Sequence, residues 1–123
     1  MPINVPDSSK RPWGNFVTLS RIESPNGDTS VVKQITVKPK GRLSLQRHRL
    51  RSEAWTILSG RGIITRGKHT FAATPTGRFF IKQGQVHRIE NTSSTEDLVF
   101  VEVTFGTFDE DDIERLEDDY ERI

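Results

Sequence analysis

The sequence predicts a single all-β domain, a barrel or sandwich of short strands that ends in a short helix. Short runs rich in Val, Ile, Thr and Phe recur along the chain, and most gaps between them hold turn-forming residues. No helical stretch lies between these runs, which is typical of barrels and sandwiches. The length of 123 residues also fits one domain.

The expected elements follow in chain order. Residues 1–14 contain prolines and a glycine among polar residues, so we expect an extended N-terminal arm. Residues 15–108 form the expected barrel, with turn formers between its strands, as in residues 24–28 (Ser-Pro-Asn-Gly-Asp). The predicted strands are Asn15–Ile22, Thr29–Lys38, Arg42–His48, Ala54–Leu58, Gly62–Arg66, Phe79–Lys82, His87–Asn91 and Leu98–Phe105.

The acidic tail, residues 109–123, has a different pattern. Its apolar residues Ile113, Leu116 and Tyr120 step by three and four, which is typical of a short amphipathic helix. We interpret the acidic residues around them as a solvated face, because most charge runs face solvent.

Composition excludes several kinds of site. The chain has no cysteine, so disulfides and thiolate metal sites are excluded, and any metal must have nitrogen and oxygen ligands. The net charge of +1 indicates no particular partner. The N-terminal residues lack an apolar signal segment, and no run approaches the ~20 apolar residues of a membrane span, so we expect a cytoplasmic protein.

The strand Arg42–His48 places polar side chains together. Because side chains alternate along a strand, one face carries Arg42, Ser44, Gln46 and His48. Leu43 and Leu45 point the other way, into packing, so the polar face lines a cavity. Glu53 follows after a short connection and can return a carboxylate to this cavity.

A second histidine, His87, opens a strand just after a glycine turn. Neutral imidazole and carboxylate together suit one divalent ion such as Zn, Mn, Co, Ni or Fe. Each histidine alone is more often structural, whereas their spacing favours a shared site. His69, in an expected hairpin, is interpreted as a surface residue.

The spacing Gly-x4-Gln-x-His-x4-Glu-x6-Gly (residues 41–60), then Gly-x2-His-x3-Asn (residues 84–91), resembles the two signature motifs of the cupin superfamily. The resemblance implies a double-stranded β-helix, a jelly-roll-like barrel, with one metal ion. The implied ligands are Gln46, His48, Glu53 and His87. Gln46 stands where cupins usually have their first histidine.

Further stretches resemble one family within the cupins. Residues 11–14 (Arg-Pro-Trp-Gly), 43–48 (Leu-Ser-Leu-Gln-Arg-His), 51–55 (Arg-Ser-Glu-Ala-Trp) and the tail from Glu110 to Arg122 look like type II phosphomannose isomerases, in the cupin domain that follows a mannose-1-phosphate guanylyltransferase domain. In that family, glutamine is usual at the position of Gln46. The resemblance implies metal-dependent interconversion of mannose 6-phosphate and fructose 6-phosphate. No nucleotide-binding domain precedes these residues, so guanylyltransferase activity is not expected.

Ala54 departs from the family, whose usual triplet is Glu-His-Trp. Strand alternation from Glu53 predicts that position 54 faces out of the barrel. If the family histidine is catalytic, its loss would favour a diverged cupin.

Isomerisation needs a proton carrier, an electrophile and a phosphate site. The metal would be the electrophile, and Glu102 and Lys33 are candidate proton carriers. The alternative is that both are ordinary strand-surface charges. Arginine forks bind phosphate, so Arg51, which matches the family, is expected to bind it and to take part in catalysis.

Among the other arginines near the motif, Arg42 shares the ligand face and is the second candidate for phosphate binding. Arg47 and Arg49 should point away from the cavity as surface charge, because they alternate with Gln46 and His48.

Other functions remain alternatives. A diverged cupin, non-catalytic or with other chemistry, would bind a sugar or sugar phosphate, and a purely structural barrel would hold no metal. The expected partner is a small sugar phosphate, with neither nucleic acid nor a membrane as partner, because the tail is acidic and aromatics do not interleave with the arginines. An unpaired N-terminal arm favours a homodimer.

Overall fold

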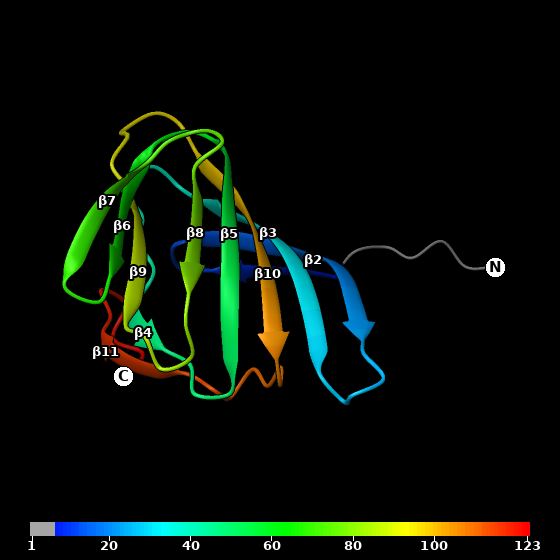
Figure 1. The fold of residues 1–123 in the computed structure, drawn as a ribbon. Helices are drawn as coiled ribbons and strands as arrows, with labels where there is room; N and C mark the ends of the chain where they lie inside the picture. Colours follow the sequence, from blue (N-terminus) through cyan, green and yellow to red (C-terminus); the bar gives the residue numbers. More distant parts are fainter. Residues whose placement is uncertain (1–6) are drawn as a thin grey trace.

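Two antiparallel sheets face each other and enclose the interior of the protein (Figure 1). The structure is a computed structural model that describes residues 7–123. The six-stranded sheet contains, in spatial order, β1 (Asp7–Arg11), β2 (Gly14–Glu23), β3 (Thr29–Val37), β10 (Leu98–Gly106), β5 (Arg51–Ser59) and β8 (Arg78–Ile81). The five-stranded sheet contains β11 (Glu114–Glu117), β4 (Leu45–Arg47), β9 (His87–Asn91), β6 (Gly62–Arg66) and β7 (His69–Ala73).

The all-β fold is confirmed, and each predicted strand is present: Gly62–Arg66 and His87–Asn91 have the predicted bounds, and the other strands have shifted bounds. The largest shifts affect β4, which is only Leu45–Arg47, and β5, which begins at Arg51. Strands β1, β7 and β11 were not predicted. Of the expected arm, residues 1–6 lie outside the described residues, and Asp7–Arg11 pairs with β2 within the chain.

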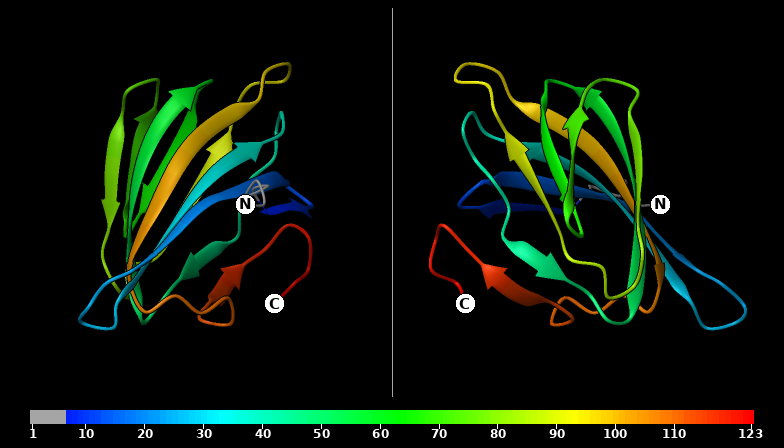
Figure 2. Two further views of the ribbon diagram at one scale, coloured as in Figure 1. Left: turned by 90° about the vertical axis from the view of Figure 1, so that its right-hand side faces the viewer. Right: turned by 60° about the vertical axis from the view of Figure 1, so that its left-hand side comes forward.

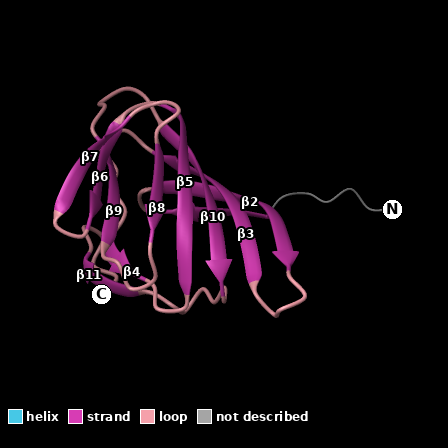
Figure 3. Ribbon diagram, viewed as in Figure 1, coloured by secondary structure: helices cyan, strands magenta, loops and turns pink. Residues whose placement is uncertain are grey.

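The predicted C-terminal helix is wrong. Residues 7–123 consist of strands and loops (Figure 3), so no helix in this part of the chain could cross a membrane. Residues Glu114–Glu117 instead form β11, which pairs with the free edge of β4, so that Arg115 lies opposite Gln46. Figure 2 shows β11, in red, beside β4, and the loop after β11 near β1.

Charge explains why cross-strand pairing prevails over the local helical period. The tail acids form ion pairs with arginines of the barrel: Glu114 with Arg47 (2.8 Å), Glu117 with Arg88 (3.2 Å) and Asp119 with Arg42 (2.6 Å). Glu117 and Asp119 stay exposed, as the prediction of a solvated face requires, but each also has an arginine of the barrel as a partner. An isolated short helix gains little free energy in water, whereas each tail contact adds to an existing sheet.

A glycine directs the chain from β10 toward this tail. Gly106 has φ of +109°, and a Cβ there would lie 2.6 Å from the carbonyl oxygen of Leu50. Residues with a side chain rarely adopt that conformation. The next residue, Thr107, donates its N–H to the same Leu50 oxygen at 3.0 Å, which holds the start of the tail against the β4–β5 turn.

The inner face of the six-stranded sheet has an apolar end and a polar end. Side chains alternate strictly along β3, β5 and β10, so every second residue is buried. The apolar end comprises Ile35, Val37, Trp55, Ile57, Leu98 and Phe100. The polar end comprises Lys33, Arg51, Glu53, Glu102 and Thr104, which are also buried.

An ion pair between Arg122 and Asp118 closes the loop after β11. We expect this pair to dominate the loss of stability of the loop in acid. Hydrogen bonds from Arg122, at 2.7 and 3.0 Å, lower the pKa of Asp118 to about 2 from the ordinary 3.8. Because the folded-state pKa is depressed, the charged form stabilises the fold above about pH 4. That contribution is lost as the pH falls from about 4 through about 2.

We therefore predict that the unfolding free energy of the wild type falls more steeply between pH 4 and pH 2 than that of Asp118→Asn, by about 2 kcal/mol or less. Denaturant titrations at each pH measure this difference. Asp111→Asn removes an exposed carboxylate from the same tail and should keep the wild-type profile. Equal slopes for the wild type and Asp118→Asn would contradict the prediction.

Candidate metal centre

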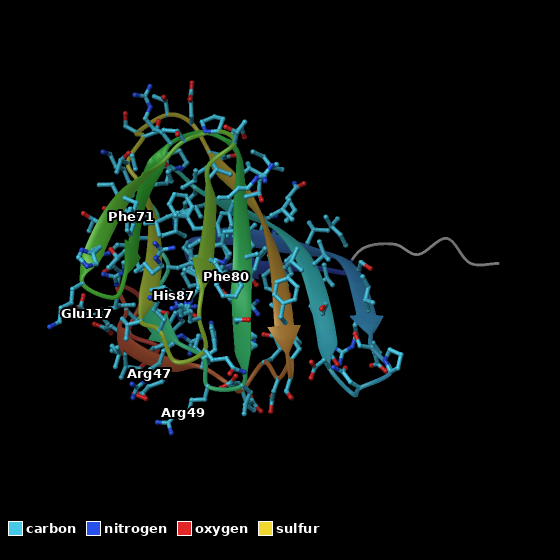
Figure 4. The ribbon with its side chains drawn as sticks, viewed as in Figure 1. Arg47, Arg49, Phe71, Phe80, His87 and Glu117 are labelled. Carbon is cyan, nitrogen blue, oxygen red and sulfur yellow. The ribbon has the colours of Figure 1, made fainter. Side chains whose placement is uncertain are left out.

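His48, Glu53 and His87 converge inside the barrel from three strand ends. Their candidate ligating atoms all lie within 4.8 Å of one another. His48 Nε2 is 3.5 Å from Glu53 Oε2, and His87 Nε2 is 3.6 Å from Glu53 Oε1. All three side chains are buried, and Figure 4 shows His87 in the space between the sheets.

Backbone carbonyls orient both imidazole rings. His48 Nδ1 lies 2.6 Å from the carbonyl oxygen of Asp112, and His87 Nδ1 lies 2.8 Å from that of Gln85. With Nδ1–H donating to these oxygens, the Nε2 lone pairs face Glu53, an arrangement common among metal-ligating histidines. Burial lowers the pKa of both rings, and the charge of Arg51 adds to this effect, so the imidazoles are neutral as ligands must be.

Glu53 is a buried carboxylate with hydrogen bonds to both oxygens. Arg51 Nε donates to Oε2 at 3.0 Å, and Trp55 Nε1 donates to Oε1 at 3.1 Å. Burial opposes the charged form, but His87, His48 and Arg51 outweigh it, so the pKa of Glu53 lies below its ordinary value. Two neutral imidazoles beside a charged carboxylate fit a divalent ion of the zinc or manganese kind.

Gln46 lines the same cavity and is buried. Its position follows from the pairing of β4 with β9, in which Gln46 lies opposite His87. The side-chain amide nitrogen of Gln46 lies 3.4 Å from the carbonyl oxygen of Ser44. That contact leaves the amide oxygen available as a further ligand.

Lys33 and Glu102 also line this cavity. Each side chain is buried, with 6% of the residue exposed, so the interpretation as strand-surface charges is wrong. They lie opposite each other in the β3–β10 pairing. Lys33 Nζ forms an ion pair with Glu110 at 3.0 Å and lies over the ring of Phe16 at 4.2 Å. Burial, together with the charge of Glu53, raises the pKa of Glu102 to about 8.

Arg51 lines the cavity, but its nitrogens are engaged by protein atoms. Besides donating to Glu53, it places Nη2 3.4 Å from His48 Nε2 and Nη1 3.4 Å from the carbonyl oxygen of Asp109. Its guanidinium also lies over the Phe108 ring at 4.7 Å. Arg51 therefore holds the candidate ligands in place and has little donor capacity left for phosphate.

Arg42 is not among the described residues that line the cavity, so the prediction that it shares the ligand face is wrong. Strand β4 begins at Leu45, and residue 42 forms only an isolated bridge with Glu90, so alternation from Gln46 does not extend that far. Two hydrogen bonds, of 2.6 and 2.7 Å, bind its guanidinium to Asp119. Arg47 and Arg49 point outward as predicted (Figure 4), and His69 is exposed in the β6–β7 hairpin.

Ala54 lies on the opposite face of β5 from Glu53. It pairs with Phe80 of β8 and Val103 of β10, and the described residues that line the cavity do not include it. The departure from the family triplet therefore leaves the composition of the cavity unchanged.

Sequence reasoning missed the contribution of the chain ends. Arg11, Ile113, Arg115 and Arg122 all line the cavity. Burial lowers the pKa of Arg115, and the positive charges of Arg122 and Arg11 act in the same direction. The family-like stretches at residues 11–14 and 110–122 are the available signal, although their local pattern predicts an arm and a helix with a solvated face.

Comparison with known proteins places the chain among sugar-phosphate-related cupins. The family described as "Mannose-6-phosphate isomerase C-terminal" matches residues 3–118. The alginate biosynthesis protein AlgA of Pseudomonas aeruginosa is 42% identical over 113 residues, covering 91% of this chain and 22% of AlgA. A mannose-1-phosphate guanylyltransferase of Salmonella muenchen is 39% identical over 108 residues, covering 87% of this chain and 22% of that protein. The chain thus spans less than a quarter of the length of these relatives.

A solved cupin-2 domain from Rhodospirillum rubrum has the same fold. The TM-score is 0.68 at 22% identity, over 87% of this chain and 78% of the other. The predicted cupin fold is confirmed by this similarity.

We predict that Glu53→Gln removes metal binding, because the substitution replaces the only charged member of the His–Glu–His cluster. Metal content of the purified protein and its thermal stabilisation by added metal measure the effect. Glu96→Gln, an exposed carboxylate, is the matched control and should bind metal like the wild type. His87→Gln preserves the Arg51–Glu53 pair and should also lose the metal, and full metal content in both site variants would overturn the assignment.

Proposed function

Because this chain belongs to the mannose-6-phosphate isomerase C-terminal family, we propose that it interconverts mannose 6-phosphate and fructose 6-phosphate with one divalent metal ion. The observation that supports this most is the meeting of two groups in one cavity. The His–Glu–His cluster and a buried carboxyl without an ion-pair partner among residues 7–123, Glu102, both line it. A metal site beside a separate proton carrier is what aldose–ketose isomerisation requires.

His48, Glu53 and His87 would hold the ion, with the Gln46 amide oxygen as a fourth ligand. A divalent ion held by these residues would supply Lewis-acid chemistry for the oxygens of the substrate. Arg51 is a positioning residue, because it fixes Glu53 and contacts His48 from the side. The apolar end of the barrel, with Trp55 and Leu43 at the cavity wall, limits the access of water to the reacting carbons.

Glu102 is the proposed proton carrier. It lies on β10 opposite Trp55 of β5 and Lys33 of β3, at the polar end of the sheet. Glu53 is less suited to this role, because a carboxylate that binds a metal is a poor base. In the forward direction, the ionised form of Glu102, whose population rises as the pH approaches its pKa of about 8, takes the proton from C2 of open-chain mannose 6-phosphate and returns it to C1, while the proton of the C2 hydroxyl passes to O1. Lys33, at the adjacent register position, contributes positive charge beside the oxygens that become negative.

We expect the metal-loaded wild type to convert mannose 6-phosphate to fructose 6-phosphate and Glu102→Gln to lose about 100-fold or more in kcat. A coupled assay measures turnover, and metal analysis of the same samples shows whether the variant keeps its metal. Glu96→Gln should retain wild-type turnover. Stoichiometric metal without turnover in the wild type would replace the isomerase with a cupin that binds a sugar or sugar phosphate.

The partner we propose is a small sugar phosphate in a cytoplasmic protein, with no role for nucleic acid or a membrane. We also propose a homodimer. An unpaired N-terminal arm does not support it, because β1 pairs with β2. The apolar outer face of the six-stranded sheet does. Leu58 and Phe80 are each 48% exposed on the outer face of the six-stranded sheet. Val101 and Val103 extend the same apolar face, and faces of this kind are commonly covered by another chain.

For the homodimer, we predict that light scattering gives twice the mass of the chain and that Phe80→Glu shifts the protein to a monomer. The introduced charge would be buried without a partner in the dimer. Arg61→Glu, at an exposed position, should remain dimeric. A monomeric wild type would contradict the proposal.

A further inference from the structure

The positively charged side chains of the cavity divide into two groups. The full set is Arg11, Lys33, Arg51, Arg115 and Arg122. Three of them have carboxylate partners: Lys33 with Glu110 at 3.0 Å, Arg51 with Glu53 at 3.0 Å, and Arg122 with Asp118 at 2.7 Å. Within residues 7–123, Arg11 and Arg115 form no such ion pair. These two cations therefore carry the uncompensated positive charge of the cavity.

Arg115 has a buried donor without an acceptor. Its Nε is shielded from solvent and has no hydrogen-bond partner among the described residues. Leaving a buried charged donor unpaired costs folding free energy, so such groups are usually satisfied by protein, water or a ligand. The charges near Arg115 are Arg122, Asp118 and Arg11. Asp118 is held by Arg122 at 2.7 Å, so positive charge remains in excess and an anion is the favoured ligand.

The position of Arg115 connects it to the candidate metal centre. It lies on β11 opposite Gln46 of β4, and Gln46 in turn lies opposite His87 of β9. Arg11 reaches the same cavity from the end of β1, with its guanidinium over the Phe16 ring at 4.9 Å. Its Nη1 donates to the carbonyl oxygen of Lys10 at 3.0 Å, which leaves other donors of the fork free.

We propose that Arg115 and Arg11 form the subsite that binds the phosphate monoester of the substrate, in the cavity that holds the His–Glu–His cluster. This inference deepens the proposed function and depends on it for the identity of the sugar. The two arginines expected from sequence have other partners, since Arg42 binds Asp119 and Arg51 binds Glu53. Arg122, paired with Asp118, adds positive charge nearby but offers fewer free donors.

The chemistry of the subsite is that of a dianion held by two guanidinium forks. A phosphate monoester presents three oxygens, and planar forks bind them with paired, charge-assisted hydrogen bonds. One of these bonds would satisfy the buried Arg115 Nε. The subsite would thereby hold the phosphate end of the sugar while C1 and C2 lie beside the His–Glu–His cluster.

Calorimetric titration of the metal-loaded full chain tests the subsite with three probes: mannose 6-phosphate, mannose and inorganic phosphate. We expect Arg115→Gln and Arg11→Gln each to weaken mannose 6-phosphate and inorganic phosphate binding by roughly 10- to 100-fold. Binding of unphosphorylated mannose and the metal content should not change. Arg61→Gln removes an exposed arginine elsewhere and should bind all three probes like the wild type.

Wild-type affinities for mannose 6-phosphate and inorganic phosphate in both arginine variants would overturn the proposal, as would a wild type that binds neither anion. Arg115→Lys, which keeps the charge but loses the fork, covers the case in which Arg115→Gln does not fold, and it should bind phosphate with intermediate affinity. Phosphate binding through Arg115 without isomerase turnover would leave the subsite standing and reject the proposed function. Turnover with an unchanged KM for mannose 6-phosphate in both variants would reject the subsite and leave the proposed function standing.

Discussion

The ion pair between Arg51 and Glu53 is the interaction on which the arrangement of the barrel interior depends. Both side chains are buried, and their closest atoms are 3.0 Å apart. Burying a single carboxylate here would carry a large desolvation cost, which the guanidinium and the Trp55 N–H offset. Arg51 also reaches His48 and the backbone of Asp109, so one cation connects a metal-ligand candidate, the base of β5 and the tail.

The same strands supply both stability and the site. On β3, β5 and β10, the inward residues are apolar toward one end and include the ionisable Lys33, Arg51, Glu53 and Glu102 toward the other, without any break in the alternation. The apolar end buries Trp55 against Phe100, with ring centres 4.9 Å apart, and fixes the strands in register. A rigid register in turn holds Glu102, Lys33 and Glu53 at constant separations, as a preorganised site requires.

The sequence predicts the placement of a side chain where the local strand pattern determines it. It does not where a partner far away in the sequence determines it. Strand alternation and motif spacing were sufficient for Gln46, His48, Glu53 and His87, which the structure brings into one cavity. The orientation of Ala54 was also predictable, because it depends only on its neighbour. The orientation of Arg42 was not predictable. Strand β4 begins three residues later, and the guanidinium of Arg42 binds Asp119, which is 77 positions away in the sequence.

The tail shows the other limit of local pattern. Its apolar spacing is helical, yet pairing with β4 and ion pairs with Arg47 and Arg88 determine its conformation. No window of sequence around residues 109–123 contains those partners. The charges of Lys33 and Glu102 likewise gave no indication of burial, because a lone charged residue in a strand usually faces solvent.

The carbonyl of Asp112 that orients His48 comes from a residue 64 positions further along the chain. Proteins are synthesised from the N-terminus at a limited rate, and earlier segments can begin to fold first. The barrel strands up to β10 are therefore all made before the segment that sets the His48 ring. A growing chain on the ribosome lacks the carbonyl that orients His48 until residues 109–122 emerge, so that a chain broken off before them has a barrel sequence without a finished centre.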